Sequence, residues 1–475
     1  MSPITATGGS VEERLAAAAL PPLLRPAWLE VDTDALASNL RTVRSLVPAG
    51  TRVAAVLKAD GYGHGLEVAA RTFRSAGAEQ LCVATLDEAL RVRRAGVDGP
   101  VLVLFPILPD AAAEAAAAGI EIVVTDEGDA AVLLERWSNA TGGYRATGGS
   151  RETGAPGQPG NPRGPGNPRG PGNSQQPGNP RGPGNSQQPG NPRRSGNESP
   201  LRVHLEVETG LMRGGVRVDA VARIARRIAG TPGVELAGVW SHLASAHDPA
   251  FSSGQEGRLA DALTSITEAG LPLPRVHLAA TGGLFCGTSR PHDMVRPGLC
   301  LYGVLPETMP VTDSARGAAA GLRPAMSLKA RSVRITSVAA GTPVGYGGVW
   351  IAERRSVIAT LPVGYGDGYT RTYQPEAEAL VRGRRVPIVG SIAMDALAVD
   401  VTEIQGVSAA DEFVLLGAQG TERITAGDLA RRRNTITWEV LSSMAYRLPR
   451  VYDAATGPRG VRTLAGEFLV REDTI

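Results

Sequence analysis

The chain has 475 residues, 42% of them hydrophobic, which is enough apolar material for the cores of two or three domains. Its 49 basic and 47 acidic side chains leave a formal charge of only +2, so the composition argues against nucleic acid as a partner. The three cysteines, Cys82, Cys286 and Cys300, are odd in number and form no CxxC pair, which excludes a disulfide framework and a cysteine-rich zinc site.

The first 25 residues are expected to form an N-terminal extension. They contain acidic residues and no basic run before a short apolar stretch, and no later segment stays apolar for about 18 residues. We therefore expect neither a secretion signal nor a membrane span, and a cytoplasmic location.

Residues 26–313 alternate short apolar runs with helical patterns, which predicts strands alternating with helices. One predicted helix runs from Thr85 to Gly96, and Glu88 completes a capping box at its start. The predicted strands are 53–57, 81–84, 101–104, 120–124, 201–207, 236–240, 275–279 and 293–297. Eight such units indicate an α/β fold with a (β/α)₈ barrel of the TIM type.

Residues 139–199 interrupt this pattern with a composition of Gly, Pro, Asn, Gln and Arg, in which PGNSQQPGNPR occurs twice. Glycine does not recur at every third position, so a collagen helix is excluded. The segment has too few apolar residues to form a core. We expect a flexible insertion within the barrel.

Residues 314–475 are rich in strand-like patterns, such as SVIATLPVG and DEFVLLG, and include a helical stretch from about Thr425 to Arg447. A second, mainly β domain is therefore expected after the barrel.

Lys58 follows the first predicted strand directly, in AVLKADGYGHG, and a glycine-rich turn leads from it into the next helix. Lys58 and Lys329 are the only lysines, since every other basic residue is an arginine. A lysine can form an imine with a carbonyl compound and an arginine cannot. Because barrel enzymes carry reactive groups at the C-terminal ends of their strands, Lys58 is a candidate catalytic residue. An ordinary surface lysine is the alternative.

Polar residues also follow the fifth to eighth predicted strands: Arg213, His242, Thr281 and Arg296. In a barrel these side chains would all lie at one mouth. Thr281 precedes two glycines and Arg296 begins the turn RPGL, and these two turns follow strands seven and eight, where barrels often bind phosphate through backbone amides. The pattern indicates a phosphorylated cofactor.

Nine segments share a pattern with a known family: LKADGYGHG, VHLEVETGLMRGG, GVWSHLASA, VHLAATGG, MVRPGLCLYG, VGYGG, LPVGYGDGY, VGSIAMD and RLPRVY. In these segments the chain resembles the alanine racemase family, whose members use pyridoxal 5'-phosphate and join a barrel to a β domain. The resemblance covers nearly all of the chain outside the insertion. It implies a homodimer with shared active sites that acts on a small-molecule amino acid.

The resemblance also implies roles for individual residues. Lys58 would hold the cofactor and act as a base on one face of the substrate, and Tyr346 from the partner subunit's β domain would act on the other face. Arg296 would contact the pyridine nitrogen. The remaining cofactor-binding positions would be Tyr62, His242, Thr281, Gly298, Leu299 and Trp438. The positions near the substrate carboxylate would be Arg213, Tyr365 and Met394.

The chain departs from the family pattern at several positions. Glu206 stands where the family often has a lysine that becomes carbamylated beside the site arginine. We hypothesise that the Glu206 carboxylate orients Arg213 instead, although an ordinary strand residue is an equally open interpretation. The other departures are Met212, Ala280, Thr281, Ser391 and Trp438, the last in place of a tyrosine at the phosphate site. These departures leave the choice of substrate open.

The resemblance implies interconversion of L- and D-alanine by a two-base mechanism, supplying D-alanine for peptidoglycan. Three alternatives remain: a racemase of another small amino acid such as serine, a decarboxylase on the same fold, and a non-catalytic cofactor-binding protein that uses the repeats as an interaction arm. No metal site is expected, because the pairs His247–Asp248 and His292–Asp293 lack the spacing of metal ligands.

Overall fold

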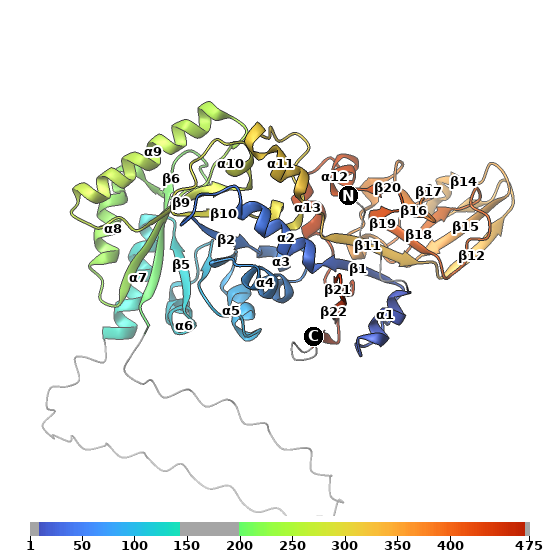
Figure 1. Cartoon of the computed structure of the whole chain (residues 1–475), viewed down its shortest axis with the longest axis horizontal. Helices are drawn as coiled ribbons and strands as arrows, with labels where there is room; N and C mark the ends of the chain where they lie inside the picture. The colour runs from blue at the N-terminus through green and yellow to red at the C-terminus, as the bar shows by residue number, and fades with distance from the viewer. Residues whose placement is uncertain (1–8, 143–198, 471–475) are drawn as a thin grey trace, which may run out of the picture.

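The computed structural model describes residues 9–142 and 199–470, which form a barrel and a mainly β domain beside it (Figure 1). Most of the insertion predicted at 139–199 lies outside the described residues, as do the first eight residues of the predicted extension. Among the described residues no helix is long and apolar enough to cross a membrane.

Eight parallel strands form a closed barrel, which confirms the predicted fold class. The strands pair in the order β5-β4-β3-β2-β10-β9-β8-β6, and β6 pairs with β5 to close the ring. All eight predicted strands are present: β2 (Arg52–Val56), β3 (Gln80–Val83), β4 (Val101–Val103), β5 (Ile120–Val124), β6 (Leu201–Glu208), β8 (Val234–Trp240), β9 (Arg275–Ala280) and β10 (Met294–Arg296). The barrel interior is therefore filled by side chains from every strand.

Helices cover the outside of the barrel (Figure 1). The predicted capping box is confirmed in α5 (Leu86–Arg94), where the Thr85 hydroxyl accepts the Glu88 amide and the Glu88 carboxylate accepts the Thr85 amide. The main covering helices are α2 (Thr33–Arg44), α4 (Leu66–Ser75), α6 (Ala112–Ala117), α7 (Glu127–Gly142), α8 (Val221–Ala229), α9 (Pro249–Glu268) and α11 (Asp313–Gly321). They bury the apolar outer face of the strands, as parallel sheets require.

The β domain is built on a second, twelve-stranded sheet with the order β12-β15-β18-β17-β16-β19-β11-β1-β21-β22-β23, in which β20 pairs with β19. Its strands are β1 (Ala27–Asp32), β11 (Met326–Arg331), β12 (Arg334–Val338), β15 (Ser356–Leu361), β16 (Glu378–Val381), β17 (Arg384–Val389), β18 (Leu397–Asp400), β19 (Glu412–Gln419), β20 (Glu422–Ile424), β21 (Arg450–Ala454), β22 (Gly457–Thr463) and β23 (Gly466–Leu469). A separate pair, β13 (Pro343–Val344) and β14 (Trp350–Ile351), extends from this domain.

Strand β1 was not predicted, yet it lies inside this sheet. It pairs antiparallel with β11 and parallel with β21 near the end of the chain. Before it, helix α1 (Val11–Ala17) packs Val11 and Leu15 against Trp28 of β1. The N-terminal segment thus belongs to the core of the β domain, beside strands from the C-terminal end.

The helical stretch predicted from Thr425 to Arg447 is two short helices, α12 (Ala426–Arg433) and α13 (Thr437–Ser442). Asn434 ends the first helix in the left-handed conformation, with φ of 54°. Helix α13 packs against the turn α3 (Lys58–Tyr62), and a Cβ at Gly63 would lie 2.2 Å from the Leu441 carbonyl oxygen. The β domain therefore contacts the turn that follows the first barrel strand.

Candidate active site

A cavity of about 570 Å³ opens at the mouth of the barrel, at the C-terminal ends of the strands. It brings together nine of the residues selected from the sequence: Lys58, Tyr62, Arg213, His242, Thr281, Arg296, Gly298, Leu299 and Trp438. These residues come from both ends of the chain, since Trp438 is on α13 and Lys58 follows β2. The mouth of a TIM-type barrel is where such folds place their active sites.

The turn that carries Lys58 has an unusual backbone. Ala59, Asp60, Gly61 and Tyr62 all have positive φ values, from 51° to 63°. A left-handed residue other than glycine costs about 1 kcal/mol or more, so such a turn needs outside support. Glu88 provides part of it, because its Oε1 accepts the Ala59 amide at 2.6 Å.

His64 and Asp60 provide further support. The buried His64 places Nδ1 3.0 Å from the carbonyl oxygens of Gly61 and Tyr62, so this nitrogen carries the proton and donates. Asp60 Oδ1 accepts the Leu66 amide at 3.1 Å. Burial lowers the pKa of His64 to about 4, which keeps the ring neutral. His64 thus supports the turn as a neutral hydrogen-bond donor.

The Lys58 amine is half-buried in the cavity wall. Burial lowers its pKa, and the positive charges of Arg213 and Arg296 lower it further, while Glu88 opposes the shift. A lowered pKa increases the fraction of neutral amine, which is the form that acts as a nucleophile and a base. Lys329, in contrast, is paired with Glu30 at 2.6 Å in the β domain.

Arg296 is held rigidly at the base of the cavity. Only 3% of it is exposed, and its Nη2 donates to the carbonyl oxygen of Ser241 at 2.8 Å. Its Nη1 donates to His277 Nδ1 at 2.5 Å. The guanidinium also lies 4.7 Å from the ring centroid of Trp240. Burial lowers the pKa of Arg296 to about 10, so it stays charged at neutral pH.

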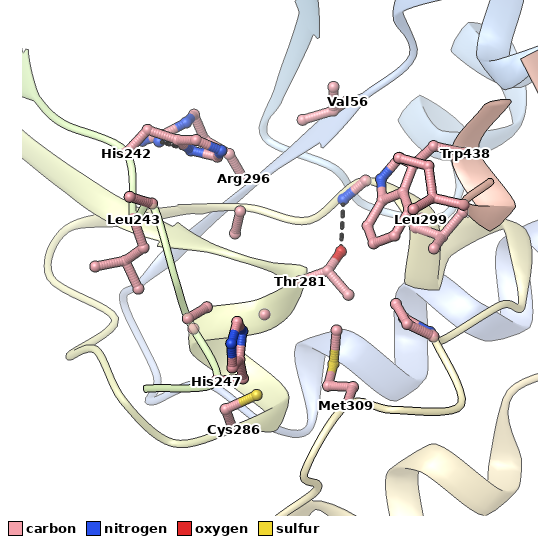
Figure 2. Close-up of a pocket in the computed structure, with 18 of the residues that line it drawn as sticks. Val56, His242, Leu243, His247, Thr281, Cys286, Arg296, Leu299, Met309 and Trp438 are labelled. Carbon is pink, nitrogen blue, oxygen red and sulfur yellow. Dashed lines mark hydrogen bonds between the residues drawn. The ribbon is translucent and has the colours of Figure 1, made fainter. Parts of the chain in front are cut away.

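His242 lies beside Arg296 in Figure 2, with its Nδ1 3.4 Å from Arg296 Nη2. Burial, followed by the charges of Arg296, Arg213 and Lys58, lowers its pKa to about 3. His242 is therefore a neutral ring that adds no charge to the cavity.

Thr281 lies near the centre of Figure 2, between His242 and Trp438. Its hydroxyl accepts the Gly298 amide at 3.1 Å and donates to Cys300 Sγ at 3.3 Å. A Cβ at Gly298 would lie only 2.6 Å from the Tyr62 hydroxyl oxygen, so no larger residue fits there. Thr281, Gly298 and Tyr62 together form a narrow cup lined by hydroxyl and amide groups, with the Trp438 indole on one side.

Arg213 lies on the loop after β6, over the ring of Phe105. Its Nη2 is 3.9 Å from Glu206 Oε1, a carboxylate that is 5% exposed. Burial raises the pKa of Glu206 to about 7, although Arg213 and Arg296 act against the shift. Glu206 is therefore a buried, weakly paired group beside the cavity, as the hypothesis of a carboxylate near Arg213 requires.

Three residues selected from the sequence lie away from this cavity. Tyr346 is 76% exposed between β13 and β14, and Tyr365 and Met394 are also exposed on the β domain. Figure 1 shows β14 at the end of the β domain that is farthest from the barrel. Within a single chain, Tyr346 and Lys58 are not in one site.

Sequence reasoning missed the polar residues beneath the mouth. His277 is buried inside the barrel and receives the Arg296 hydrogen bond, and Arg462 of the tail strand β22 pairs with Asp60 in the Lys58 turn. For His277 the available signal was a histidine at an inward position of an apolar strand. Nothing comparable marked Arg462, because the strands after residue 450 were not predicted. Among the described residues no cluster of three or more His, Cys, Asp or Glu could hold a metal ion.

A closed barrel with a polar cavity at its mouth, joined to a β domain that contacts the same mouth, defines a two-domain barrel enzyme. The family model for the N-terminal domain of alanine racemase matches residues 31–146 and 191–306, and the model for the C-terminal domain matches residues 325–452. The chain belongs to the alanine racemase family.

The curated relatives include the alanine racemase of Symbiobacterium thermophilum, 34% identical over 91% of this chain and 98% of that protein. Another is the alanine racemase of Nostoc sp., 31% identical over 90% of this chain and 95% of that protein. Among solved structures, alanine racemase from Bacillus anthracis with bound L-Ala-P superposes with a TM-score of 0.76 at 26% identity, covering 94% of this chain and 99% of that one. Histidine racemase from Leuconostoc mesenteroides superposes with a TM-score of 0.70 at 25% identity, covering 91% and 99%.

Proposed function

We propose that this protein interconverts L- and D-alanine with pyridoxal 5'-phosphate as its cofactor, and so supplies D-alanine for peptidoglycan. The observation that carries the proposal is the Lys58 amine, which is half-buried at the barrel mouth with a lowered pKa. The family relationship identifies alanine as the first substrate to test.

The residues of the cavity fit this cofactor. Lys58 offers an amine that would hold the aldehyde carbon, and the buried Arg296 offers a guanidinium donor for the pyridine nitrogen. In the cup of Thr281, Gly298 and Tyr62, the Tyr62 hydroxyl offers a donor for a phosphate, and Gly298 has no side chain to block it. When bound, the cofactor supplies a conjugated ring that takes up the electron pair left as the substrate's α-proton departs.

In this proposal the protein's own residues move the proton. Lys58 takes or returns the α-proton on one face of the substrate, and the Tyr346 hydroxyl does so on the other. Arg213 binds the substrate carboxylate, because a guanidinium offers a pair of donors that matches two carboxylate oxygens. Arg296 keeps its proton near neutral pH, so it donates a hydrogen bond without protonating the ring.

The proposed mechanism requires a second copy of the chain. Tyr346 is 76% exposed, and four further exposed apolar or aromatic residues lie on its own segment or on the hydrogen-bonded segments around Ser391 and Ala393: Val349, Ile351, Tyr365 and Met394. An exposed cluster of this kind is typical of a protein–protein interface. We propose a homodimer in which each β domain contributes Tyr346, Tyr365 and Met394 to the cavity of the other copy.

The test is to purify the protein with added pyridoxal 5'-phosphate, record its visible absorbance, and fix the cofactor covalently with borohydride. We expect peptide mapping to place the cofactor on Lys58 and not on Lys329, the only other lysine. Lys58→Ala should lose racemisation of alanine by about 1,000-fold or more, since it removes both the anchor and one base. Lys329→Arg is the matched control and should keep full activity.

Serine and histidine should be assayed beside alanine, with measurement of released carbon dioxide. If kcat/KM for serine or histidine is higher than for alanine, that amino acid and not alanine is the preferred substrate. Release of carbon dioxide would indicate a decarboxylase. Bound cofactor without turnover of any amino acid would reject the enzymatic proposal.

A further inference from the structure

A line of buried polar side chains runs through the barrel interior beneath Arg296. Arg296 Nη1 is 2.5 Å from His277 Nδ1, and His277 Nε2 is 2.8 Å from His204 Nδ1. His204 Nε2 is 2.8 Å from Glu121 Oε2, which also accepts a hydrogen bond from Gln80 at 2.7 Å. The line connects β10 at the mouth, through β9 and β6, to β5 and β3 at the opposite end of the barrel.

Arg296 at one end and Glu121 at the other determine which ring nitrogens of His277 and His204 carry a hydrogen. A guanidinium can only donate, so His277 must present an unprotonated Nδ1 to Arg296 and carry its hydrogen on Nε2. That hydrogen is donated to His204 Nδ1, so His204 in turn carries its hydrogen on Nε2. A carboxylate can only accept, and Glu121 accepts this last hydrogen. From Arg296 through the two rings, each hydrogen bond therefore points toward Glu121, and Gln80 donates to the same carboxylate from the other side.

The electrostatics agree with this arrangement. Burial lowers the pKa of His277 and of His204, so both rings are neutral. Burial alone would raise the pKa of Glu121, but the hydrogen bonds from His204 and Gln80 and the charge of Arg202 lower it, so the carboxylate is ionised. The five side chains of the line are all nearly or completely buried, with Arg296 the most exposed at 3%.

The surrounding strands are shaped to hold the line. Gly238 on β8 lies against His204, and a Cβ there would be 2.2 Å from His204 Nδ1. At the base of the barrel, Arg202 lies 3.3 Å from Glu121 Oε1 and 3.2 Å from Glu235 on the surface. The Glu121 carboxylate is thus fixed on both of its oxygens.

We propose that Glu121 is a positioning residue for Arg296, acting through the neutral rings of His204 and His277. The charged acceptor at the base of the barrel strengthens each hydrogen bond above it, because linked hydrogen bonds polarise one another. His277 Nδ1 thereby becomes a stronger acceptor for Arg296 Nη1. Glu121 holds the guanidinium edge in place from the far end of the barrel, without touching the cavity.

The role assigned to Arg296 rests on the proposed function, but the coupling along the line can be tested apart from it. The holoenzyme is prepared with 15N-labelled histidine, and the ring nitrogens and their protons are observed by NMR. In the unaltered protein, His204 and His277 are expected as neutral rings with hydrogen on Nε2. A hydrogen on Nδ1, or a doubly protonated ring, at either position would overturn the proposal without any variant.

Glu121→Gln replaces the charged acceptor with a neutral amide of similar shape. We expect the Nε2 proton signals to move upfield at His204 and also at His277, which does not touch residue 121. The visible circular dichroism of the bound cofactor should change as well. For alanine, kcat should fall about tenfold with KM changed less than about twofold, as expected when a group outside the cavity positions one inside it.

Glu121→Asp keeps a carboxylate and should recover most of the lost kcat. Glu235→Gln is the matched control, because Glu235 also pairs with Arg202 but touches neither histidine, and it should change no readout. A signal shift confined to His204, or a kcat within twofold of the unaltered enzyme in Glu121→Gln, would refute the coupling. If His277 responds in a protein that racemises no amino acid, the line of hydrogen bonds stands and the proposed function fails.

Discussion

Arg462 donates two hydrogen bonds to the Asp60 carboxylate, from Nη1 at 2.8 Å and from Nη2 at 2.6 Å. Asp60 lies in the left-handed turn that follows Lys58, and Arg462 lies on β22 near the end of the chain. The Arg462 guanidinium also lies 4.5 Å from the ring centroid of Tyr446. A residue of the tail therefore braces the turn that carries the proposed cofactor lysine.

Asp60→Asn should destabilise the protein by about 3 kcal/mol, because it leaves the buried Arg462 charge without its partner. The free energy of unfolding in urea measures the effect, and the absorbance of bound cofactor should fall in parallel as the turn loosens. Asp219→Asn, which breaks an exposed pair with Arg217, is the control and should not change either quantity measurably. A fully stable Asp60→Asn protein with normal cofactor content would contradict this interpretation.

Gly298→Ala should impair cofactor binding. The added methyl would lie 2.6 Å from the Tyr62 hydroxyl oxygen, so the cup at the phosphate end must change shape. We expect cofactor affinity to fall about tenfold or more, measured by fluorescence titration of the cofactor-free protein. Gly257→Ala on helix α9, where a Cβ meets nothing within 4 Å, should leave the affinity unchanged.

Glu206 should control substrate binding through pH. Burial raises the pKa of Glu206 to about 7, above its usual value near 4.5. Below about pH 7 the folded protein keeps a proton on Glu206, and the stability of the fold that depends on this proton is lost as the pH rises through about 7. Only the ionised form attracts Arg213. KM for alanine should therefore decrease between pH 6 and pH 8.

In Glu206→Gln this dependence of KM on pH should disappear, and KM should be about three- to tenfold higher at pH 8 with cofactor content unchanged. Glu208→Gln, two residues further along β6, is the comparison. Its carboxylate accepts backbone amides of the following loop and does not pair with Arg213, so the decrease of KM near pH 7 should persist. Identical pH profiles for Glu206→Gln and the unaltered enzyme would reject the role.

Mixed dimers test whether each site uses two chains. Lys58→Ala and Tyr346→Phe proteins should each be nearly inactive alone. When the two proteins are unfolded and refolded together, half of the dimers contain one copy of each variant. One of the two sites in each mixed dimer then has both bases, so about a quarter of normal activity should return. No recovery would mean that Lys58 and Tyr346 act in the same chain or not at all.

The sequence predicted the barrel well because its strands are short apolar runs separated by helical patterns and capping signals such as Thr85 and Glu88. It also placed Lys58, Arg213, His242, Thr281 and Arg296 at one mouth, because the ends of parallel strands meet there by geometry. The other four cavity residues, Tyr62, Gly298, Leu299 and Trp438, were selected only through the family resemblance. The tail strands and β1 were missed because the sheet that pairs them joins segments more than 400 residues apart, and short-range patterns do not report such pairing.

The polar line beneath Arg296 could not be predicted for a related reason. His204, His277 and Glu121 sit on three different strands, and each alone reads as an isolated polar residue in an apolar run. Their hydrogen bonds depend on the stagger of the closed barrel, which sets the residues that face one another inside it. The partnership becomes visible only when the strands are placed in space.

The position of β1 between β11 and β21 has a consequence for biosynthesis. The ribosome makes residues 27–32 more than 400 residues before their parallel neighbour at 450–454. Until residues 450–454 are made, one edge of this strand lacks its partner and can pair with other chains, which is a common origin of aggregation. A nascent polypeptide truncated before residue 450 should therefore be captured by chaperones far more than the finished protein, and ribosome-bound fragments of graded length would reveal where that dependence ends.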